Sequence, residues 1–136
     1  MSIEENKAIV RRWNEETINK GNADIVDELA AADYVNHAGG FGREGHKQYL
    51  RAVGAAFSSI DIAIEDLIAE GDKVVIRWTL KATHTGEYMG VPATGKQVEM
   101  KGMSMYRLAN AKIVEDWSSS DQLGFMQQLG LVPKMG

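Results

Sequence analysis

Residues 112–131 read KIVEDWSSSDQLGFMQQLGL, a stretch in which a strand pattern is followed at once by a short helical pattern. Ile113, Trp117 and Asp121 share parity along the strand, so the acid is expected to point the same way as the tryptophan. Asp121 stands where strand and helix meet. A carboxylate directed into an apolar cavity is a candidate general acid or base, since burial raises its pKa. Aspartate is also a favoured N-cap, so a structural role explains it equally well.

Three more long strands precede this stretch. Apolar and polar residues alternate over residues 60–69 and again over residues 74–84, and Glu-Gly-Asp at 70–72 is a turn signal between them. Over residues 98–105 the apolar parity changes at Gly102. A glycine at a change of parity predicts a β-bulge, which would curve the sheet.

The first third of the chain has the spacing of helices. Ser2 and Glu5 form a capping box, in which each side chain satisfies a free backbone N–H group. The predicted elements are helices over residues 2–19, 23–30 and 43–57, a short extended segment over 34–37, and a last helix that begins at Asp121 or Gln122.

Helices followed by long strands predict an α+β fold. We expect the N-terminal helices to pack in the concave face of a curved antiparallel four-stranded meander, with a short additional strand and a short C-terminal helix. No linker or repeat interrupts the pattern, so residues 1–136 are predicted to form a single domain. A curved sheet covered by helices on its concave face leaves a cavity with a mouth.

The meander order decides which polar residues meet. His84 and Asp121 are the last residues of two predicted strands and lie at the same end of the sheet, about 10 Å apart. They are therefore expected to face one small molecule from two sides. Glu115 shares the inward parity but lies about 20 Å from Asp121 and cannot act with it. A lone histidine is more often a hydrogen-bonded core residue than a catalyst, which applies to His84 and His37 alike. His46 is predicted to be at the surface.

Composition excludes several classes of function. The net charge of −4 argues against a general affinity for nucleic acid or anionic membranes, and the lack of cysteine excludes disulfides and thiolate sites. The three histidines lack the spacing of a metal site, no nucleotide or cofactor fingerprint is present, and Ser118-Ser119-Ser120 lacks the context of a nucleophile elbow. The N-terminus lacks the apolar core of a signal peptide, and no apolar run approaches the ~20 residues of a membrane span. We expect a soluble cytoplasmic protein.

Four segments together carry a resemblance to a known family. They are NKAIVRRWNEETINKGN at 6–22, DYVNH at 33–37, IEDLIAEGDKVVIRWTLKATHTGEYMGVPATGK at 64–96 and KIVEDWSSSDQLGFMQQLG at 112–130. With these segments the chain resembles the SnoaL-like polyketide cyclases (ester cyclases) of the nuclear-transport-factor-2-like superfamily. That superfamily also holds ketosteroid isomerases and limonene epoxide hydrolases.

The resemblance implies a cystatin-like cone, an α+β barrel with a deep hydrophobic pocket and no cofactor, assembled as a homodimer or homotetramer through the outer sheet face. In the characterised cyclases an aspartate at the end of the last strand is the acid/base, and Asp121 matches it within its D-x-L-G setting. His84 in T-H-x-G-E and His37 match pocket positions. Two departures concern the pocket mouth: AGGFG at 38–42 replaces a proline-bearing loop, and Asp116 stands where a histidine is common.

The first hypothesis for function is an enzyme of the polyketide cyclase type that works by acid–base chemistry. Asp121 would remove a proton α to a carbonyl, His84 and His37 would assist, and intramolecular aldol closure would follow. The alternatives are a non-catalytic carrier or sensor of small apolar molecules, an interaction scaffold, or a related isomerase or epoxide hydrolase. The expected ligand is a small apolar or aromatic molecule, and the predicted lining residues are Trp13, Phe41, Trp78, Met100, Tyr106, Trp117 and Met126.

Overall fold

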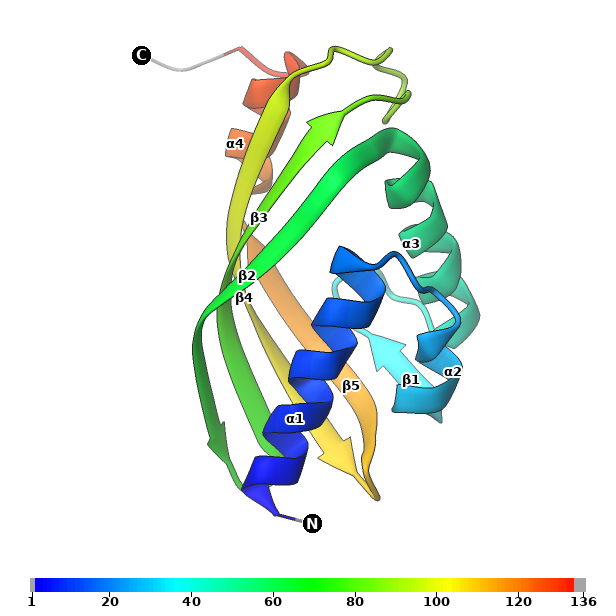
Figure 1. Ribbon diagram of the computed structural model, residues 1–136, viewed down its shortest axis with the longest axis vertical. Helices are drawn as coiled ribbons and strands as arrows, with labels where there is room; N and C mark the ends of the chain where they lie inside the picture. The colour runs from blue at the N-terminus through cyan, green and yellow to red at the C-terminus, as the bar shows by residue number, and fades with distance from the viewer. Residues whose placement is uncertain (1, 134–136) are drawn as a thin grey trace.

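One curved sheet organises the molecule, and the computed structural model describes it within residues 2–133 (Figure 1). Its strands stand in the order β1-β5-β4-β3-β2, with β1 parallel to β5 and all other pairs antiparallel. The elements are α1 (Ile3–Asn14), the π-helical turn η1 (Glu15–Asn19), α2 (Ile25–Leu29), β1 (Ala30–Asn36), α3 (Arg43–Ala56), β2 (Phe57–Glu70), β3 (Lys73–His84), β4 (Gln97–Ala109), β5 (Lys112–Ser120) and α4 (Gln122–Leu129).

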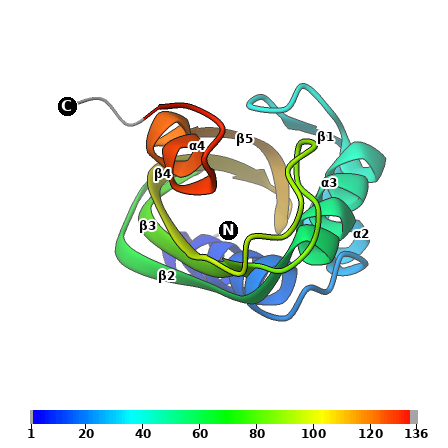
Figure 2. The ribbon, with the colours of Figure 1, turned by 90° about the horizontal axis from the view of Figure 1, so that it is seen from above.

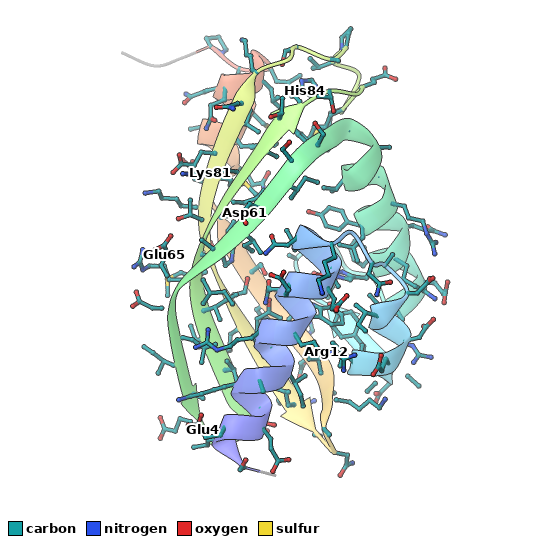
Figure 3. All side chains as sticks on the ribbon, in the orientation of Figure 1. Glu4, Arg12, Asp61, Glu65, Lys81 and His84 are labelled. Carbon is teal, nitrogen blue, oxygen red and sulfur yellow. The ribbon has the colours of Figure 1, made fainter. Side chains whose placement is uncertain are left out.

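The helices cover the concave side of the sheet, so the predicted α+β fold is confirmed. Helix α1 packs on β2, β3 and β5, and α3 bridges from β1 to β2. Seen from above, the sheet and α3 form a ring with α1 inside it (Figure 2). Side chains such as Glu65 and Lys81 point away from this ring (Figure 3). None of the described helices is long and apolar enough to cross a membrane.

The first helix begins as predicted and ends earlier. The Glu5 N–H donates to Ser2 Oγ at 3.0 Å, as in a capping box. The α-helix ends at Asn14, whose Nδ2 donates to the Val10 carbonyl at 2.9 Å, and a π-helical turn follows. Thr17 Oγ1 donates to the Trp13 carbonyl at 2.7 Å. Side chains that bond to carbonyls of the preceding turn disturb the regular ladder, which fits the change of helix type here.

The predicted bulge at Gly102 is wrong. Strands β3 and β4 pair without interruption from Thr83↔Gln97 to Lys73↔Arg107. Gly102 lies opposite Trp78, and a Cβ atom there would stand 2.5 Å from Trp78 Cζ2. The glycine therefore makes room for an indole ring. The apolar residue that suggested a parity change, Met103, faces outward and is 53% exposed.

The bulge lies instead in β5. Arg107 pairs with Glu115, whereas the next residue of β4, Leu108, pairs with Ile113. Val114 is therefore one residue in excess, and two residues of β5 oppose one of β4. Before Val114 the odd-numbered Ile113 faces inward and is fully buried. After Val114 the even-numbered residues of β5 face inward.

One extra residue reverses the predicted facing of the whole upper half of β5. Asp116 and Ser118 face inward because they pair with the inward residues of β4. Glu115 and Trp117 were predicted to face inward and face outward. The parity argument for Asp121 fails for the same reason, because it assumed an uninterrupted strand.

Strand β4 continues beyond the end of β5, and helix α4 covers the free edge. The Gln128 side chain accepts from the Glu99 N–H through Oε1 at 2.8 Å and donates through Nε2 to the Glu99 carbonyl at 2.8 Å. The Asp121 N–H donates to the Lys101 carbonyl at 3.0 Å. These contacts satisfy backbone groups that an exposed edge would leave open.

Candidate functional site

Asp116 is a buried carboxyl in β5 and is 4% exposed. The Tyr34 hydroxyl donates to Oδ2 at 2.7 Å, whereas Oδ1 has no hydrogen-bond partner within residues 2–133. Burial raises the pKa of Asp116 to about 6, against opposing effects of the Tyr34 hydrogen bond and the His37 charge. A carboxyl with a free oxygen and a pKa near neutrality has the properties of a general acid or base.

An aromatic group holds Tyr34 in place beside Asp116. The Tyr34 ring lies 5.6 Å from Trp13 and 5.7 Å from His46. Burial, with the nearby Asp116 charge, raises the pKa of Tyr34, so its hydroxyl stays a hydrogen-bond donor. His46 is buried and stacks on Trp13 at 5.2 Å, so its predicted surface position is wrong. Burial lowers the pKa of His46 to about 4, so this ring is neutral near pH 7.

The inward face of β5 leads from Asp116 toward solvent. Ser118 faces inward, because its Oγ lies 2.7 Å from Oγ of Ser104, a buried residue on β4. Nevertheless Ser118 is exposed, and Ser120 beyond it is half-buried. The concave side of the sheet is therefore open along the upper part of β5, and Asp116 lies at the buried end of this accessible row.

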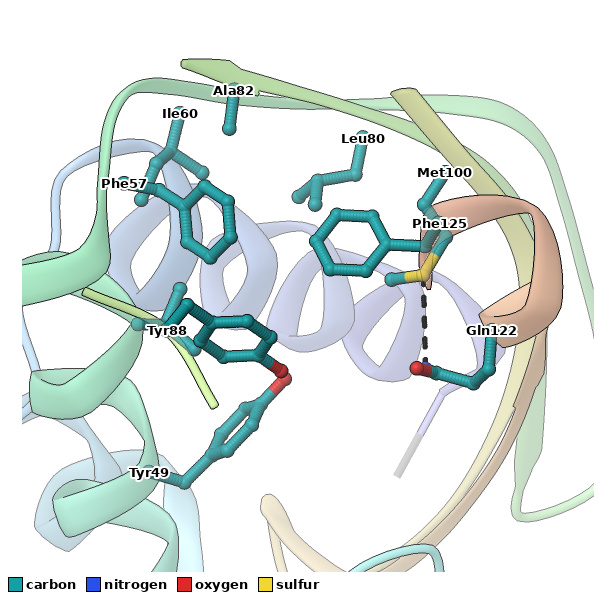
Figure 4. A pocket seen from close by; sticks show the side chains of 10 residues that line it. Tyr49, Phe57, Ile60, Leu80, Ala82, Tyr88, Met100, Gln122 and Phe125 are labelled. Atoms are coloured by element: carbon teal, nitrogen blue, oxygen red, sulfur yellow. Dashed lines mark hydrogen bonds between the residues drawn. The ribbon is translucent and has the colours of Figure 1, made fainter. Parts of the chain in front are cut away.

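An apolar pocket of about 50 Å³ lies at the upper end of the cone (Figure 4). Four rings line it: Phe57 lies 5.1 Å from Tyr88 and 5.7 Å from Phe125, and Tyr49 stands at the rim. Gln122 is its most polar lining residue, and Gln122 Nε2 donates to Ser120 Oγ at 2.9 Å, which joins the pocket to the inward row of β5. The lining residues are Tyr49, Val53, Phe57, Ile60, Leu80, Ala82, Tyr88, Met100, Gln122 and Phe125.

The pocket is smaller than ligand sites usually are, which range from about 300 to 1,000 Å³. Side chains must move before a bulky molecule enters. Tyr49 is 46% exposed and stands at the rim, which makes its ring the easiest to displace. A larger hollow of about 400 Å³ lies between Glu99, Lys101, Asp121 and Gln128. It is an open surface depression beside charged side chains, so it does not shield a reaction from water.

Asp121 caps helix α4. Its Oδ1 accepts from the Gly124 N–H at 2.9 Å, and the residue is exposed in the surface depression just described. The expectation that Asp121 points into the cavity with Trp117 is wrong, because the bulge at Val114 changes the parity of β5. Its catalytic role stays a prediction, and the geometry favours the alternative of an N-cap.

His84 is fully buried at the upper end of β3 (Figure 3). Its Nδ1 accepts from the Thr94 N–H at 3.3 Å and lies 2.9 Å from Thr94 Oγ1, so His84 anchors the loop that follows β3. Its ring packs 5.3 Å from Phe57, and its Nε2 has no partner within the described residues. The structure places His84 behind a pocket wall and Asp121 on the surface, and within residues 2–133 no contact joins them.

His37 lies on the outer side of the sheet. Its ring stacks on Trp117 at 4.9 Å, and its Nε2 lies 2.8 Å from Glu115 Oε1. Glu115 also pairs with Arg107. These hydrogen bonds, first that from His37 and then that from Arg107, lower the pKa of Glu115. His37 and Trp117 therefore form a cluster on the outer face, opposite to the Asp116 side chain, and the His37 N–H donates to the Asp116 carbonyl at 3.0 Å.

The other predicted lining residues divide between core and pocket. Met100 lies in the apolar pocket. Trp13, Trp78 and Tyr106 are buried in the main core, where α1 packs on the sheet. Phe41 lies 6.0 Å from Tyr49 at the rim. Met126 is half-buried on α4 and does not line the described pocket.

Sequence reasoning missed Asp116 as a site residue and missed most of the aromatic lining. The signal for Tyr49 was present, because it neighbours Leu50 on a helix with an apolar face. The signal for Asp116 was its position before Trp117, which was noted only as a departure from a family pattern. The local sequence contains no signal for the extra residue at Val114, which turns the Asp116 side chain inward.

Comparison with known proteins places the chain among cyclases. The family model for SnoaL-like polyketide cyclases matches residues 8–129. Aklanonic acid methyl ester cyclase DnrD of Streptomyces peucetius is 30% identical over 133 residues, which cover 90% of this chain and 88% of DnrD.

Two solved structures are similar in both sequence and fold. A presumed polyketide cyclase from Acidithiobacillus ferrooxidans is 31% identical, with a TM-score of 0.83 over 96% of this chain and 98% of that chain. IdmH, a presumed polyketide cyclase from Streptomyces antibioticus, is 32% identical, with a TM-score of 0.75 over 86% of this chain and 93% of that chain.

Proposed function

The chain belongs to the SnoaL-like polyketide cyclase family, and we propose that it closes a ring within a small carbonyl compound, with Asp116 as the acid and base. One observation carries the proposal: Asp116 is buried, its pKa is raised to about 6, and one of its oxygens has no partner within the described residues. The apolar part of the substrate would occupy the aromatic pocket, and its reacting carbonyl group would extend along β5.

The reaction needs one proton to be removed and returned. Asp116 Oδ1 takes a proton from a carbon α to a carbonyl, which leaves an enolate. The enolate carbon attacks a second carbonyl of the same molecule, so a carbon–carbon bond forms and the attacked oxygen becomes an alkoxide. Asp116 then returns the proton to this alkoxide, and the product is an isomer of the substrate. A pKa near the working pH suits both steps.

Tyr34 positions the acid. Its hydroxyl occupies Oδ2, so Oδ1 is the oxygen that is left for the substrate. Because the pKa of Tyr34 is raised by burial, the phenol does not compete as a base. Removal of the hydroxyl in Tyr34→Phe should lower the rate less than loss of the carboxyl does, since Tyr34 acts through Asp116.

Two aspartates on the same segment provide a matched test. The compound is aklanonic acid methyl ester, which the name of the Streptomyces peucetius relative states. Cyclised product and uptake of deuterium from D₂O at the α-carbon are measured for Asp116→Asn and Asp121→Asn. We expect Asp116→Asn to lose about 10²- to 10⁴-fold in rate, as for removal of a general base. Asp121→Asn should keep the rate, because asparagine remains a good cap.

The opposite result would return the catalytic role to Asp121. A wild-type protein that gives neither product nor deuterium uptake would overturn the proposal for this substrate class. In that case the alternative is a carrier or sensor for small apolar molecules, which the small aromatic pocket with its single amide side chain favours. A carrier would be stabilised thermally by its ligand and would show no dependence on Asp116.

We also propose that the outer sheet face joins two copies of the chain into a homodimer. Large apolar side chains are exposed on β1, β2 and β4, namely Val35 at 38%, Ile68 at 68% and Met103 at 53%. Analytical ultracentrifugation of wild type and of Met103→Lys would test this. A dimer that persists in the variant would exclude Met103 from the interface.

A further inference from the structure

A chain of hydrogen bonds crosses the inner face of three strands and ends at an exposed hydroxyl. Trp78 Nε1 donates to Ser104 Oγ at 3.0 Å, and Ser104 Oγ lies 2.7 Å from Ser118 Oγ. Trp78 and Ser104 are buried, whereas Ser118 is exposed. The buried end of the chain is thus fixed, and its other end faces the open concave side of the sheet.

The direction of this chain is fixed at its Trp78 end. An indole N–H can only donate, so Ser104 Oγ is the acceptor in its bond with Trp78. Ser104 keeps one proton of its own, and in the bond between Ser104 and Ser118 either hydroxyl can be the donor. When Ser118 accepts, its own proton is left to point into the open space. Hydrogen bonds in such a chain polarise one another, which makes the last hydroxyl a stronger donor.

We propose that Ser118 binds the carbonyl oxygen of the substrate whose α-proton Asp116 removes. This inference rests on the proposed function and adds a second residue to it. Asp116 and Ser118 face the same side of β5 two residues apart, about 6.6 Å at about 3.3 Å per residue. That spacing suits a carbonyl oxygen held by one residue and its neighbouring carbon beside the other.

The role of Ser118 is to stabilise charge without transferring a proton. As Asp116 takes the proton, the carbonyl becomes an enolate and negative charge gathers on its oxygen. The hydrogen bond from Ser118 strengthens at this moment, and the proton stays on the hydroxyl. The ligand class is therefore an enolisable ketone or ester that presents its carbonyl to β5 and its apolar part to the aromatic pocket.

The neighbouring serine supplies a matched control. Ser119 is exposed like Ser118 but pairs with Met103 on the outer face. Substitution of either residue by alanine removes the same hydroxyl group from the same strand. A general effect on β5 would therefore appear in both variants, whereas contact with the substrate would appear only in Ser118→Ala.

The experiment measures kcat, KM and deuterium uptake for Ser118→Ala, Ser119→Ala and Ser104→Ala with aklanonic acid methyl ester over pH 5–9. We expect Ser118→Ala to lower kcat/KM about 10- to 100-fold, mostly in kcat, with an unchanged kinetic pKa. Ser119→Ala should equal wild type. Ser104→Ala should slow the reaction, and the double variant Ser104→Ala/Ser118→Ala should be no slower than Ser118→Ala, because both act through one hydrogen bond.

The outcomes separate this inference from the proposed function. Equal rates for Ser118→Ala and Ser119→Ala, with Asp116→Asn inactive, would overturn the role of Ser118 and keep that of Asp116. Strictly additive losses in the double variant would exclude a chain directed through Ser104. Wild-type protein with neither product nor exchange would overturn both proposals together. If Ser104→Ala proves unstable because it leaves the Trp78 N–H unpaired, the Ser118 and Ser119 pair still decides the question.

Discussion

Strand β4 pairs with β3 on one side and with β5 on the other. The pairing with β3 is regular, whereas the pairing with β5 contains one extra residue in β5. Toward β3 the register is unbroken from Gln97 to Arg107, and alternation along β3 correctly predicts which of its side chains face inward. Toward β5 the extra Val114 shifts the register between Arg107 and Leu108. The side with the regular ladder builds the core, and the side with the bulge turns Asp116 inward. A single residue in excess therefore decides that the Asp116 side chain faces the interior of the molecule.

The largest expected effect on stability lies on the side of the bulge. The pKa of Asp116 is raised from 3.8 to about 6, so the folded protein binds this proton more tightly than the unfolded chain does. Its contribution to stability is therefore full below pH 4 and is lost as the pH rises through about 6. The loss is about 3 kcal/mol at most, at 1.36 kcal/mol per pH unit.

Asp116→Asn removes that penalty. The variant should be about 1–3 kcal/mol more stable than wild type at pH 8 and nearly equal to it at pH 4. Urea unfolding at both pH values measures the difference. A difference that does not change with pH would mean that the bulge does not bury an ionisable carboxyl, and the comparison between the two sides of β4 would lose its functional meaning.

The next effect lies on the regular side. A Cβ atom on Gly102 would stand 2.5 Å from Trp78 Cζ2 and 2.8 Å from the Ser119 carbonyl oxygen, so Gly102→Ala should cost about 1–3 kcal/mol. Gly54→Ala on α3 is the control, because a Cβ atom there meets nothing of residues 2–133 within 4 Å. In a helix that change should stabilise by about 0.5–1 kcal/mol.

A further experiment separates the two obstacles to Gly102→Ala, which are the Trp78 ring and the Ser119 carbonyl oxygen. If the Trp78 ring is the obstacle, Trp78→Leu should reduce the cost of Gly102→Ala in a double-mutant cycle, which thermal unfolding can follow. An unchanged cost would place the obstacle at the Ser119 carbonyl oxygen, 2.8 Å from the added Cβ atom.

The smallest expected effect concerns the upper end of β4, where β5 has ended and only β3 still pairs with β4. Gln128 bonds both backbone groups of Glu99, so Gln128→Ala should cost about 1–2 kcal/mol. Gln127→Ala is the matched control, because the Gln127 side chain makes a single longer bond, to the Pro133 carbonyl at 3.3 Å. Equal losses in the two variants would show that the edge is held by α4 packing and not by the amide.

Local patterns in the sequence were sufficient for the order of elements and for much of the sheet. The capping box at Ser2, the turn at 70–72 and the alternation along β3 act through neighbouring residues, so they can be recognised without the fold. The limits of α3 and α4 were predicted within a residue or two, because caps and stop signals are local as well. The prediction of cavity-lining tryptophans failed, since a large apolar ring suits a core and a pocket equally well.

The sequence by itself determined the α+β class, the curved meander and the family, because alternation, capping and family segments are properties of neighbouring residues. Only the tertiary structure decided that Asp116 faces the interior and Asp121 the surface. The direction of a side chain in β5 depends on the register with β4, and one unpaired residue reverses that direction. The local sequence contains no signal for this unpaired residue. Likewise Ser104 and Ser118, fourteen residues apart, meet only through that register. Asp121 therefore caps a helix at the surface, and Asp116 is the acid that β5 directs into the interior.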